Sequence, residues 1–191
     1  MALNPFSEEQ IIARLQFENP WWASGNLDSY YRALNPRLYF TLFYPLVKHS
    51  AVHRATVLMG PRRVGKTVML YHAIQQLIAD GVPAQKIMYA SVETPIYNNI
   101  PLHDLFNMAK KATGNTESDG WYIFFDEVQY LKDWEVHLKT LVDSFRQTKF
   151  IASGSAAAAL KLKSNESGAG RFTDFMLPPL TFFEFIHLKN L

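Results

Sequence analysis

The chain has 191 residues, of which 48% are hydrophobic, which is enough for one α/β domain with a buried core and excludes global disorder. Its 19 basic and 17 acidic side chains leave a net charge of +2, and this near balance gives no support to a large nucleic-acid surface. Cysteine is absent, which excludes disulfide bonds and thiolate metal sites and is consistent with a reducing cytoplasm.

Residues 1–50 predict an N-terminal arm that is helical and rich in aromatic residues. Ser7-Glu8-Glu9-Gln10 has the pattern of a capping box and predicts a short helix. The aromatic residues from Trp21 to Tyr44 either pack the arm against the rest of the chain, which is the commoner use, or stack on a base or a partner. The start of the chain lacks a signal-peptide pattern, and the longest apolar run, residues 38–47, is too short to cross a bilayer. We therefore expect a cytoplasmic protein with no membrane contact.

The domain predicted over residues 51–191 begins with a strand, a glycine-containing loop and a helix. An apolar β-branched run predicts a strand over 55–59, and helical periodicity predicts a helix over 66–80. The loop between them fits G-x-x-x-x-G-K-[ST] with no mismatch, and its glycines let the N–H groups form an anion nest at the helix N-terminus. We predict a phosphate-binding loop whose nucleotide-binding residues are Gly60, Pro61, Arg62, Arg63, Val64, Gly65, Lys66, Thr67 and Val68.

Two side chains of this loop have separate predicted roles. Lys66 places a positive charge on the β- and γ-phosphates of a bound nucleotide. The hydroxyl group of Thr67 is placed to ligate Mg²⁺. Together they predict a nucleoside triphosphate and a magnesium ion as the ligands of the loop.

An acidic pair follows further along the chain. A strand is predicted over 86–92 and a helix over 101–114, after which the apolar run 121–125 ends in Asp126 and Glu127. Such a run is typical of a strand buried on both faces of a parallel sheet, and ligands bind at the carboxyl end of such strands. We predict that Asp126 holds Mg²⁺, usually through a water molecule, and that Glu127 is the general base that activates the attacking water.

Two serines end the next strand. Asp133 is predicted to cap a helix, and a strand over 148–153 follows it. Ser153 is predicted to sense the γ-phosphate or to hold the attacking water. Ser155 is open to the same role and also to capping a helix over 156–160, and both functions can hold at once.

The C-terminal part of the chain contributes an arginine. The loop over 165–171 ends in Arg171, for which two roles are open: it stabilises γ-phosphate charge, in its own chain or in a neighbouring subunit, or it forms a surface salt bridge. A last strand is predicted over 175–180. Thr181-Phe182-Phe183-Glu184 has the pattern of a second capping box and opens another helix.

These motifs, taken in order, resemble a known family. The motifs are Gly60 to Thr67, Phe125-Asp126-Glu127-Val128-Gln129, Trp134-Glu135, Ser153-Gly154-Ser155, Gly170-Arg171 and Pro179-Leu180-Thr181-Phe182-Phe183-Glu184-Phe185. The chain resembles the additional-strand, catalytic-glutamate division of P-loop NTPases over roughly residues 50–188. Within it, the chain is similar to prokaryotic AAA-type ATPases related to the archaeal ATPases and the signal-transducing (STAND-like) NTPases.

The resemblance implies an α/β fold with a parallel sheet sandwiched by helices, and ATP and Mg²⁺ as ligands. In that family the ATPase domain is usually followed by a winged-helix-like region and a C-terminal endonuclease-like domain. This chain ends before either, so we expect the C-terminal lid and the later domain to be absent.

Mg²⁺-dependent ATP hydrolysis is the predicted function, and two alternatives remain open. One is a nucleotide-gated switch in signalling or defence that turns over little ATP. The other is a P-loop small-molecule kinase, for which the sequence offers no recognisable acceptor pocket. Besides ATP, the predicted partners are another protein or further copies of the chain, whereas the charge balance gives nucleic acid no support.

Overall fold

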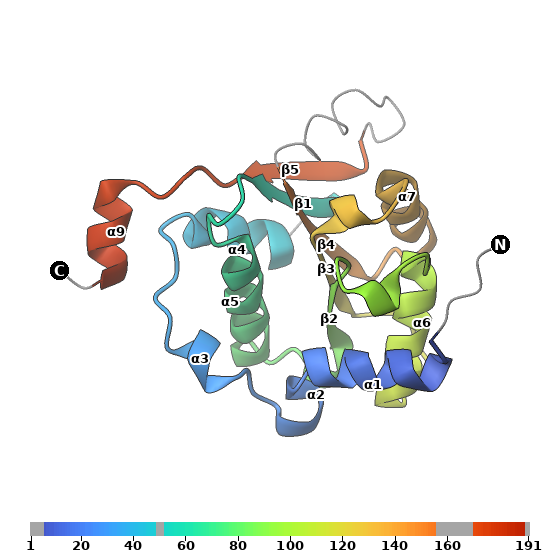
Figure 1. Cartoon of the computed structure of the whole chain (residues 1–191). Helices are drawn as coiled ribbons and strands as arrows, with labels where there is room; N and C mark the ends of the chain where they lie inside the picture. The colour runs from blue at the N-terminus through green and yellow to red at the C-terminus, as the bar shows by residue number, and fades with distance from the viewer. Residues whose placement is uncertain (1–5, 49–51, 156–169, 190–191) are drawn as a thin grey trace.

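The centre of the molecule is a five-stranded parallel sheet with the strand order β2-β3-β4-β1-β5. The computed structural model describes residues 6–48, 52–155 and 170–189 (Figure 1). The strands are β1 (Ala55–Gly60), β2 (Ile87–Ser91), β3 (Tyr122–Asp126), β4 (Lys149–Ser155) and β5 (Phe172–Met176). Because β4 lies between β1 and β3, the loop-bearing strand and the acidic strand are not neighbours. The predicted fold class, a parallel sheet of the additional-strand type, is confirmed.

Helices cover both faces of this sheet (Figure 1). On one face lie α4 (Phe40–Lys48) and α5 (Lys66–Ala79), and on the other lie α6 (Leu102–Thr113) and α7 (Trp134–Ser144). The inward side of α5 buries its apolar residues at helical spacing, and these are Met69, Leu70, Ala73, Ile74 and Leu77. All six residues of β1 are buried, as expected for a strand covered on both faces.

The N-terminal segment packs against the core. Its helices are α1 (Glu8–Glu18), α2 (Trp21–Ser24) and α3 (Ser29–Arg32). The predicted capping box of α1 is confirmed, because Ser7 Oγ accepts from Gln10 N and Gln10 Oε1 accepts from Ser7 N. The indole N–H groups of Trp21 and Trp22 both donate to the carbonyl of Ile87, at 2.9 and 2.7 Å. These two aromatic residues therefore pack the arm onto β2, which was the commoner of the two predicted uses.

The predicted boundaries of the last strand were wrong. β5 begins three residues before the predicted range 175–180 and ends within it. One further backbone bond, from Leu177 N to Met59 O at 2.7 Å, extends the pairing with β1. Pro178 and Pro179 then stop it, because proline has no N–H to donate to a neighbouring strand.

The two later helix caps differ in outcome. The box before α9 (Phe182–Lys189) is confirmed, because Glu184 N donates to Thr181 Oγ1 at 3.2 Å and Thr181 N donates to Glu184 Oε2 at 3.5 Å. Asp133 does occupy the N-cap position of α7, but its side chain makes no capping bond. Its backbone is left-handed at φ +53°, whereas a capping side chain usually extends from β-region backbone.

Two predicted segments fall outside the described residues. They are the helix over 156–160 and most of the loop over 165–171, so the capping role of Ser155 stays a prediction. Within the three described ranges, no helix is long and apolar enough to cross a membrane.

Gly60 at the end of β1 must lack a side chain. A Cβ built there would lie 2.6 Å from the carbonyl oxygen of Leu177, which is fixed by its place beside β1. We expect Gly60→Ala to lower the free energy of unfolding by about 1–3 kcal/mol, measured by chemical denaturation. Gly81→Ala is the reference for backbone strain alone: a methyl group there meets nothing within 4 Å, and the left-handed backbone at φ +88° costs about 1–2 kcal/mol, whereas Gly60 has no such backbone. Equal stability of Gly60→Ala and the wild type would contradict this account.

Candidate nucleotide-binding site

The phosphate loop leaves β1 at Gly60 and enters α5 at Gly65. Gly65 is the N-cap of α5 with φ +90°, a conformation that glycine adopts at little cost. Arg63 also has a left-handed backbone, at φ +63°. Pro61 and Arg62 are exposed like Arg63, so this part of the loop lies at the surface of the molecule. This alternation of backbone hands at a helix N-terminus is the geometry of an anion-binding nest.

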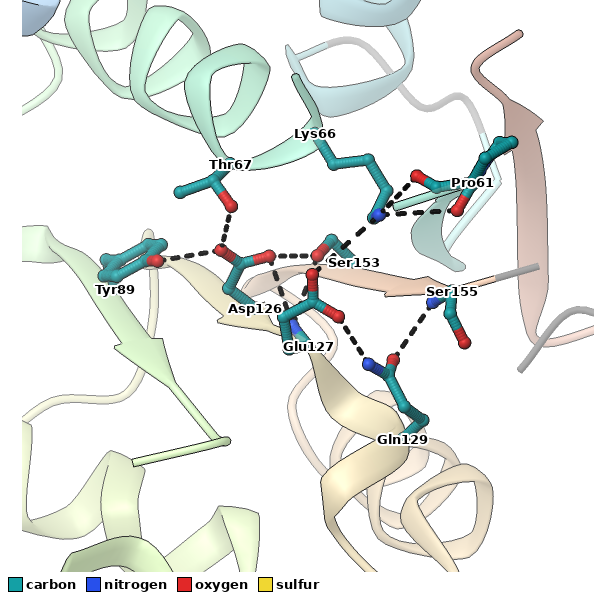
Figure 2. A network of polar contacts seen from close by, with 10 residues as sticks. Pro61, Lys66, Thr67, Tyr89, Asp126, Glu127, Gln129, Ser153 and Ser155 are labelled. Atoms are coloured by element: carbon teal, nitrogen blue, oxygen red, sulfur yellow. Dashed lines mark hydrogen bonds and ion pairs between the residues drawn. The ribbon is translucent and has the colours of Figure 1, made fainter. Parts of the chain in front are cut away.

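Lys66 is the buried cation of the site. Its side chain is 3% exposed, and its ammonium group donates to the carbonyls of Gly60 at 3.3 Å and Pro61 at 3.0 Å. The same nitrogen lies 3.8 Å from Oε1 of Glu127. Figure 2 shows Lys66 extended between the loop and the acidic pair, so it faces the space where both could contact a phosphate.

The Asp126 carboxylate is held by four donors. Thr67 Oγ1 and the hydroxyl group of Tyr89 donate to its Oδ2 at 2.7 and 2.8 Å. Ser153 Oγ and, at 3.1 Å, the N–H of Glu127 donate to its Oδ1 (Figure 2). The residue is 2% exposed, and every oxygen of this buried charge is therefore hydrogen-bonded.

Thr67 and Asp126 form an oxygen donor pair suited to Mg²⁺. They stand 59 residues apart in sequence, yet their oxygens lie within hydrogen-bonding distance. Mg²⁺ favours hard oxygen ligands and is usually held by one or two protein groups together with water and phosphate. Among the described residues there is no group of three or more His, Cys, Asp or Glu side chains that would form a metal cage. The residues present fit a shared metal–phosphate site.

Glu127 is held in an unusual conformation beside this pair. Its backbone is left-handed, with φ +56° and ψ +46°, a region in which a non-glycine residue is strained. Gln129 Nε2 donates to Glu127 Oε2, and Gln129 Oε1 in turn accepts from Ser155 N at 3.0 Å. The Glu127 side chain is 22% exposed, so it is fixed by protein contacts but open to water.

The two predicted serines occupy different places. Ser153 is fully buried; its Oγ donates to Asp126 and accepts from the N–H of Glu127 at 3.2 Å. It therefore stabilises the acidic pair from the buried side of the site. Ser155 is paired with Gly60 in the sheet register and lies at the loop, where its N–H holds Gln129.

The structure does not bring Arg171 to the phosphate loop. Its carbonyl accepts from Ala55 N at 2.9 Å, which places it at the amino end of β1. Gly60 lies at the opposite end of that strand, about 17 Å away at the rise of an extended chain. The guanidinium Nε instead donates to Asp143 at 2.9 Å, and both side chains are about half exposed. Of the predicted roles, the structure shows the surface salt bridge and separates Arg171 from the phosphate loop of its own chain.

Sequence reasoning missed Tyr89, Gln129 and Arg37. Burial, and next the charge of Asp126, raise the pKa of Tyr89 well above its ordinary value, so its hydroxyl group keeps the proton that it donates. Gln129 stands two residues after Glu127, and this proximity was the available signal. Arg37 has no sequence signal, because its contacts to Val64 and to distant Glu184 arise only from folding.

A cavity of about 420 Å³ opens beside the loop. Val64, Gly65 and Val68 form one wall, Leu34 belongs to the N-terminal segment, and Leu180 precedes α9. Its lining is largely apolar, which suits a flat hydrophobic group attached to a phosphate chain. The predicted loop residue Val68 thus faces this cavity.

The fold and the site define the class of the protein. A parallel sheet with β4 between β1 and β3, together with the G-x-x-x-x-G-K-[ST] loop facing an acidic pair, defines a P-loop NTPase of the additional-strand type. The sequence matches the AAA domain family over residues 52–186, and the chain belongs to that family. The match supports a domain of the nucleotide-binding, ATPase type, and the predicted AAA-type membership is confirmed.

The curated relatives are longer than this chain. An uncharacterized protein of Haemophilus influenzae is 28% identical over 134 residues, which cover 70% of this chain and 33% of the relative. An uncharacterized protein of Methanocaldococcus jannaschii is 30% identical over 140 residues, which cover 72% of this chain and 29% of the relative. The chain thus spans about a third or less of the curated relatives that it matches.

Solved structures share the fold. The Aeropyrum pernix ORC1 protein, solved in complex with DNA, matches with a TM-score of 0.59 and 12% identity, over 89% of this chain and 52% of that chain. Hsp104 of S. cerevisiae, from its complex with casein, matches with a TM-score of 0.59 and 16% identity, over 90% and 31% of the two chains. At these identities the likeness concerns the fold alone.

The hydroxyl group of Ser153 forms one hydrogen bond to the Asp126 carboxylate and one to the N–H of Glu127. We expect Ser153→Ala to lower the free energy of unfolding by about 1–3 kcal/mol, because it removes a donor from a buried carboxylate. Ser144→Ala is the control, since Ser144 lies at an exposed position in the last turn of α7 and takes no part in this network. Thermal or chemical unfolding checks the pair, and equal effects of the two substitutions would contradict the role given to Ser153.

Proposed function

We propose that this chain binds ATP with Mg²⁺ on the loop from Gly60 to Val68 and hydrolyses the γ-phosphate bond. One observation carries the proposal: Lys66, Thr67, Asp126 and Glu127 meet at the carboxyl edge of one parallel sheet. A buried cation, two oxygen ligands and a partly exposed carboxylate are the groups that phosphoryl transfer to water requires.

The loop would hold the phosphates. Backbone N–H groups at the start of α5 are the donors for the phosphate oxygens, and the dipole of the helix favours their negative charge. Lys66 Nζ would exchange its bonds to the Gly60 and Pro61 carbonyls for stronger bonds to ionised phosphate oxygens.

Thr67 and Asp126 would hold the magnesium ion, which supplies neutralising charge at the phosphates when bound. Glu127 would accept a proton from the attacking water as the water oxygen bonds to the γ-phosphorus and ADP leaves. Gln129 keeps the Glu127 carboxylate in place through the bond to its Oε2. Ser153 fixes the backbone of Glu127 and thereby the direction in which the base points.

The apolar cavity beside Gly65 is the place for the nucleoside base. It borders the loop where α5 begins, so a base there would be continuous with phosphates in the nest. Its walls combine aliphatic residues with Phe185, His72 and basic side chains, and adenine itself is inferred from the family. A role for Arg171 in hydrolysis would require a neighbouring copy of the chain, and its exposed ion pair with Asp143 is accessible to one.

Lys66→Ala is expected to weaken Mg-ATP binding by about 100-fold or more, because two charge-assisted hydrogen bonds of about 1.5–3 kcal/mol each are lost. Isothermal titration calorimetry with a non-hydrolysable ATP analogue measures this. Lys86→Ala is the control, since Lys86 lies at the amino end of β2 and donates to Asp119. Unchanged affinity of Lys66→Ala for the analogue would show that the loop does not bind the nucleotide.

Glu127→Gln is expected to keep nucleotide affinity and lower the hydrolysis rate by about 10²–10⁴-fold, the usual contribution of a general base. Glu93→Gln makes the same change at an exposed position just after β2 and serves as the control. Phosphate release and nucleotide affinity are measured on both. Full hydrolysis by Glu127→Gln would refute the assignment of the base.

The same measurements distinguish the alternatives. Tight ATP binding with negligible turnover in the wild type would favour a nucleotide-gated switch. A phosphorylated acceptor formed without release of phosphate would favour a kinase.

A further inference from the structure

A buried ion pair joins the N-terminal segment to α9. Arg37 Nε donates to Glu184 Oε1 at 2.8 Å, and Arg37 Nη2 donates to Glu184 Oε2 at 2.7 Å. The two residues are 7% and 2% exposed and stand 147 residues apart in sequence. A bidentate pair of this kind fixes both the position and the orientation of the guanidinium plane.

The same guanidinium contacts the phosphate loop. Arg37 Nη1 donates to the carbonyl of Val64 at 2.8 Å. Nη1 and Nη2 also donate to the carbonyl of Pro178, at 3.3 and 3.2 Å. One side chain therefore ties together the N-terminal segment, the loop and the chain that leads into α9.

The bond to Val64 determines where the next N–H points. In a trans peptide unit the C=O and the following N–H point in opposite directions. With the Val64 carbonyl held by Arg37, the N–H of Gly65 is directed to the other side of the loop backbone. Gly65 is the N-cap of α5, so its N–H belongs to the anion nest.

This peptide unit needs a restraint. Glycine populates positive and negative φ with similar ease, so the unit between Val64 and Gly65 is the one that can turn over at least cost. A turned unit would present a carbonyl oxygen to the phosphates in place of an N–H. The bond from Arg37 holds it in the orientation that binds an anion.

Glu184 keeps Arg37 in place. The hydrogen bonds from Arg37 lower the pKa of the Glu184 carboxyl group, which therefore stays ionised at neutral pH. Thr181 adds two further contacts to Glu184 Oε2, both at 3.5 Å, so the carboxylate is bound to the cap of its own helix as well.

We propose that Arg37 is a positioning residue for the phosphate loop, and that Glu184 couples the docking of α9 to the affinity of the loop for phosphate. The inference rests on the proposed function, because it concerns the same loop. Coupling is reciprocal, so a triphosphate on the loop would also favour the docked position of α9. A movement of α9 away from Arg37 would then weaken the binding of the nucleotide.

The test uses inorganic tripolyphosphate with Mg²⁺ as the probe. Arg37 also lines the apolar cavity, and a probe without a base reports on the loop alone. We expect Arg37→Met to weaken tripolyphosphate binding at least tenfold and Glu184→Gln to weaken it about threefold, measured by calorimetry. In the double variant the second substitution should add nothing, because both act through one contact.

Arg14→Met is the control for the loss of an arginine–glutamate pair away from the loop. Arg14 also pairs with a buried glutamate, Glu18, at 2.8 Å, but on α1 and without a contact to the loop. NMR-detected hydrogen exchange at the Gly65 amide, without any ligand, supplies a second measurement. Exchange should be faster in Arg37→Met than in Arg14→Met, whereas a general loss of stability would accelerate it in both.

The possible failures are distinguishable. If the wild type binds neither ATP nor tripolyphosphate, the proposed function fails and the inference fails with it. A second outcome is that the wild type binds both ligands while Arg37→Met and Glu184→Gln bind tripolyphosphate as tightly as the wild type does. In that case the inference alone is wrong. If Arg37→Met does not fold, Glu184→Gln and its Gly65 exchange rate decide the question.

Discussion

One buried carboxylate connects the parts of this site. Asp126 accepts hydrogen bonds from Tyr89 on β2, Ser153 on β4 and Thr67 on α5, and from the backbone that follows its own strand. A buried charge without such partners would be strongly unfavourable, so the carboxylate is acceptable only when all of these elements are in register. The bonds that satisfy Asp126 thereby also set the spacing between the first turn of α5 and the carboxyl edge of the sheet.

The remaining polar groups are arranged around that anchor. Lys66 faces Glu127 at 3.8 Å, so a buried cation and a carboxylate compensate each other across the loop. Glu127 keeps a left-handed backbone that its hydrogen-bond partners hold in place. On the outer side of the loop, Arg37 and Glu184 compensate each other in the same way and fix the peptide unit before Gly65. The cations of both ion pairs, Lys66 and Arg37, thus donate hydrogen bonds to carbonyls of the loop.

The local sequence was sufficient to predict the elements and candidate site residues wherever neighbouring residues define both the structure and the chemistry. The loop from Gly60 to Thr67 is contiguous, and the roles proposed for its glycines, lysine and threonine depend on one turn and one helix N-terminus. Asp126 and Glu127 were singled out because an apolar run of this kind is typical of a buried parallel strand and because it follows a matched phosphate loop, whereas acids at a strand end are by themselves a weak signal. The strand–helix order of the chain predicted the parallel sheet, because each strand and each helix has its own local pattern. The start of 175–180 was wrong because the polar residues Thr173 and Asp174 hid a strand that they share with Phe172. The end was wrong because the pairing with β1 stops after Leu177, before the two prolines.

Tertiary structure decided which distant residues meet. Tyr89 reaches Asp126, and Arg37 reaches Glu184, through separations of 37 and 147 residues that no local pattern encodes. The tertiary structure also separates Arg171 from the phosphate loop of its own chain, because β5 runs parallel to β1 and Arg171 lies at its amino end. The sequence by itself determined the loop proposed to hold the phosphates, since its geometry is local. Thr67 and Asp126 are named by the sequence, but only the folded sheet brings their oxygens together. The supports of those groups depend on strand order and on the packing of the two ends of the chain, which exist only in the folded protein.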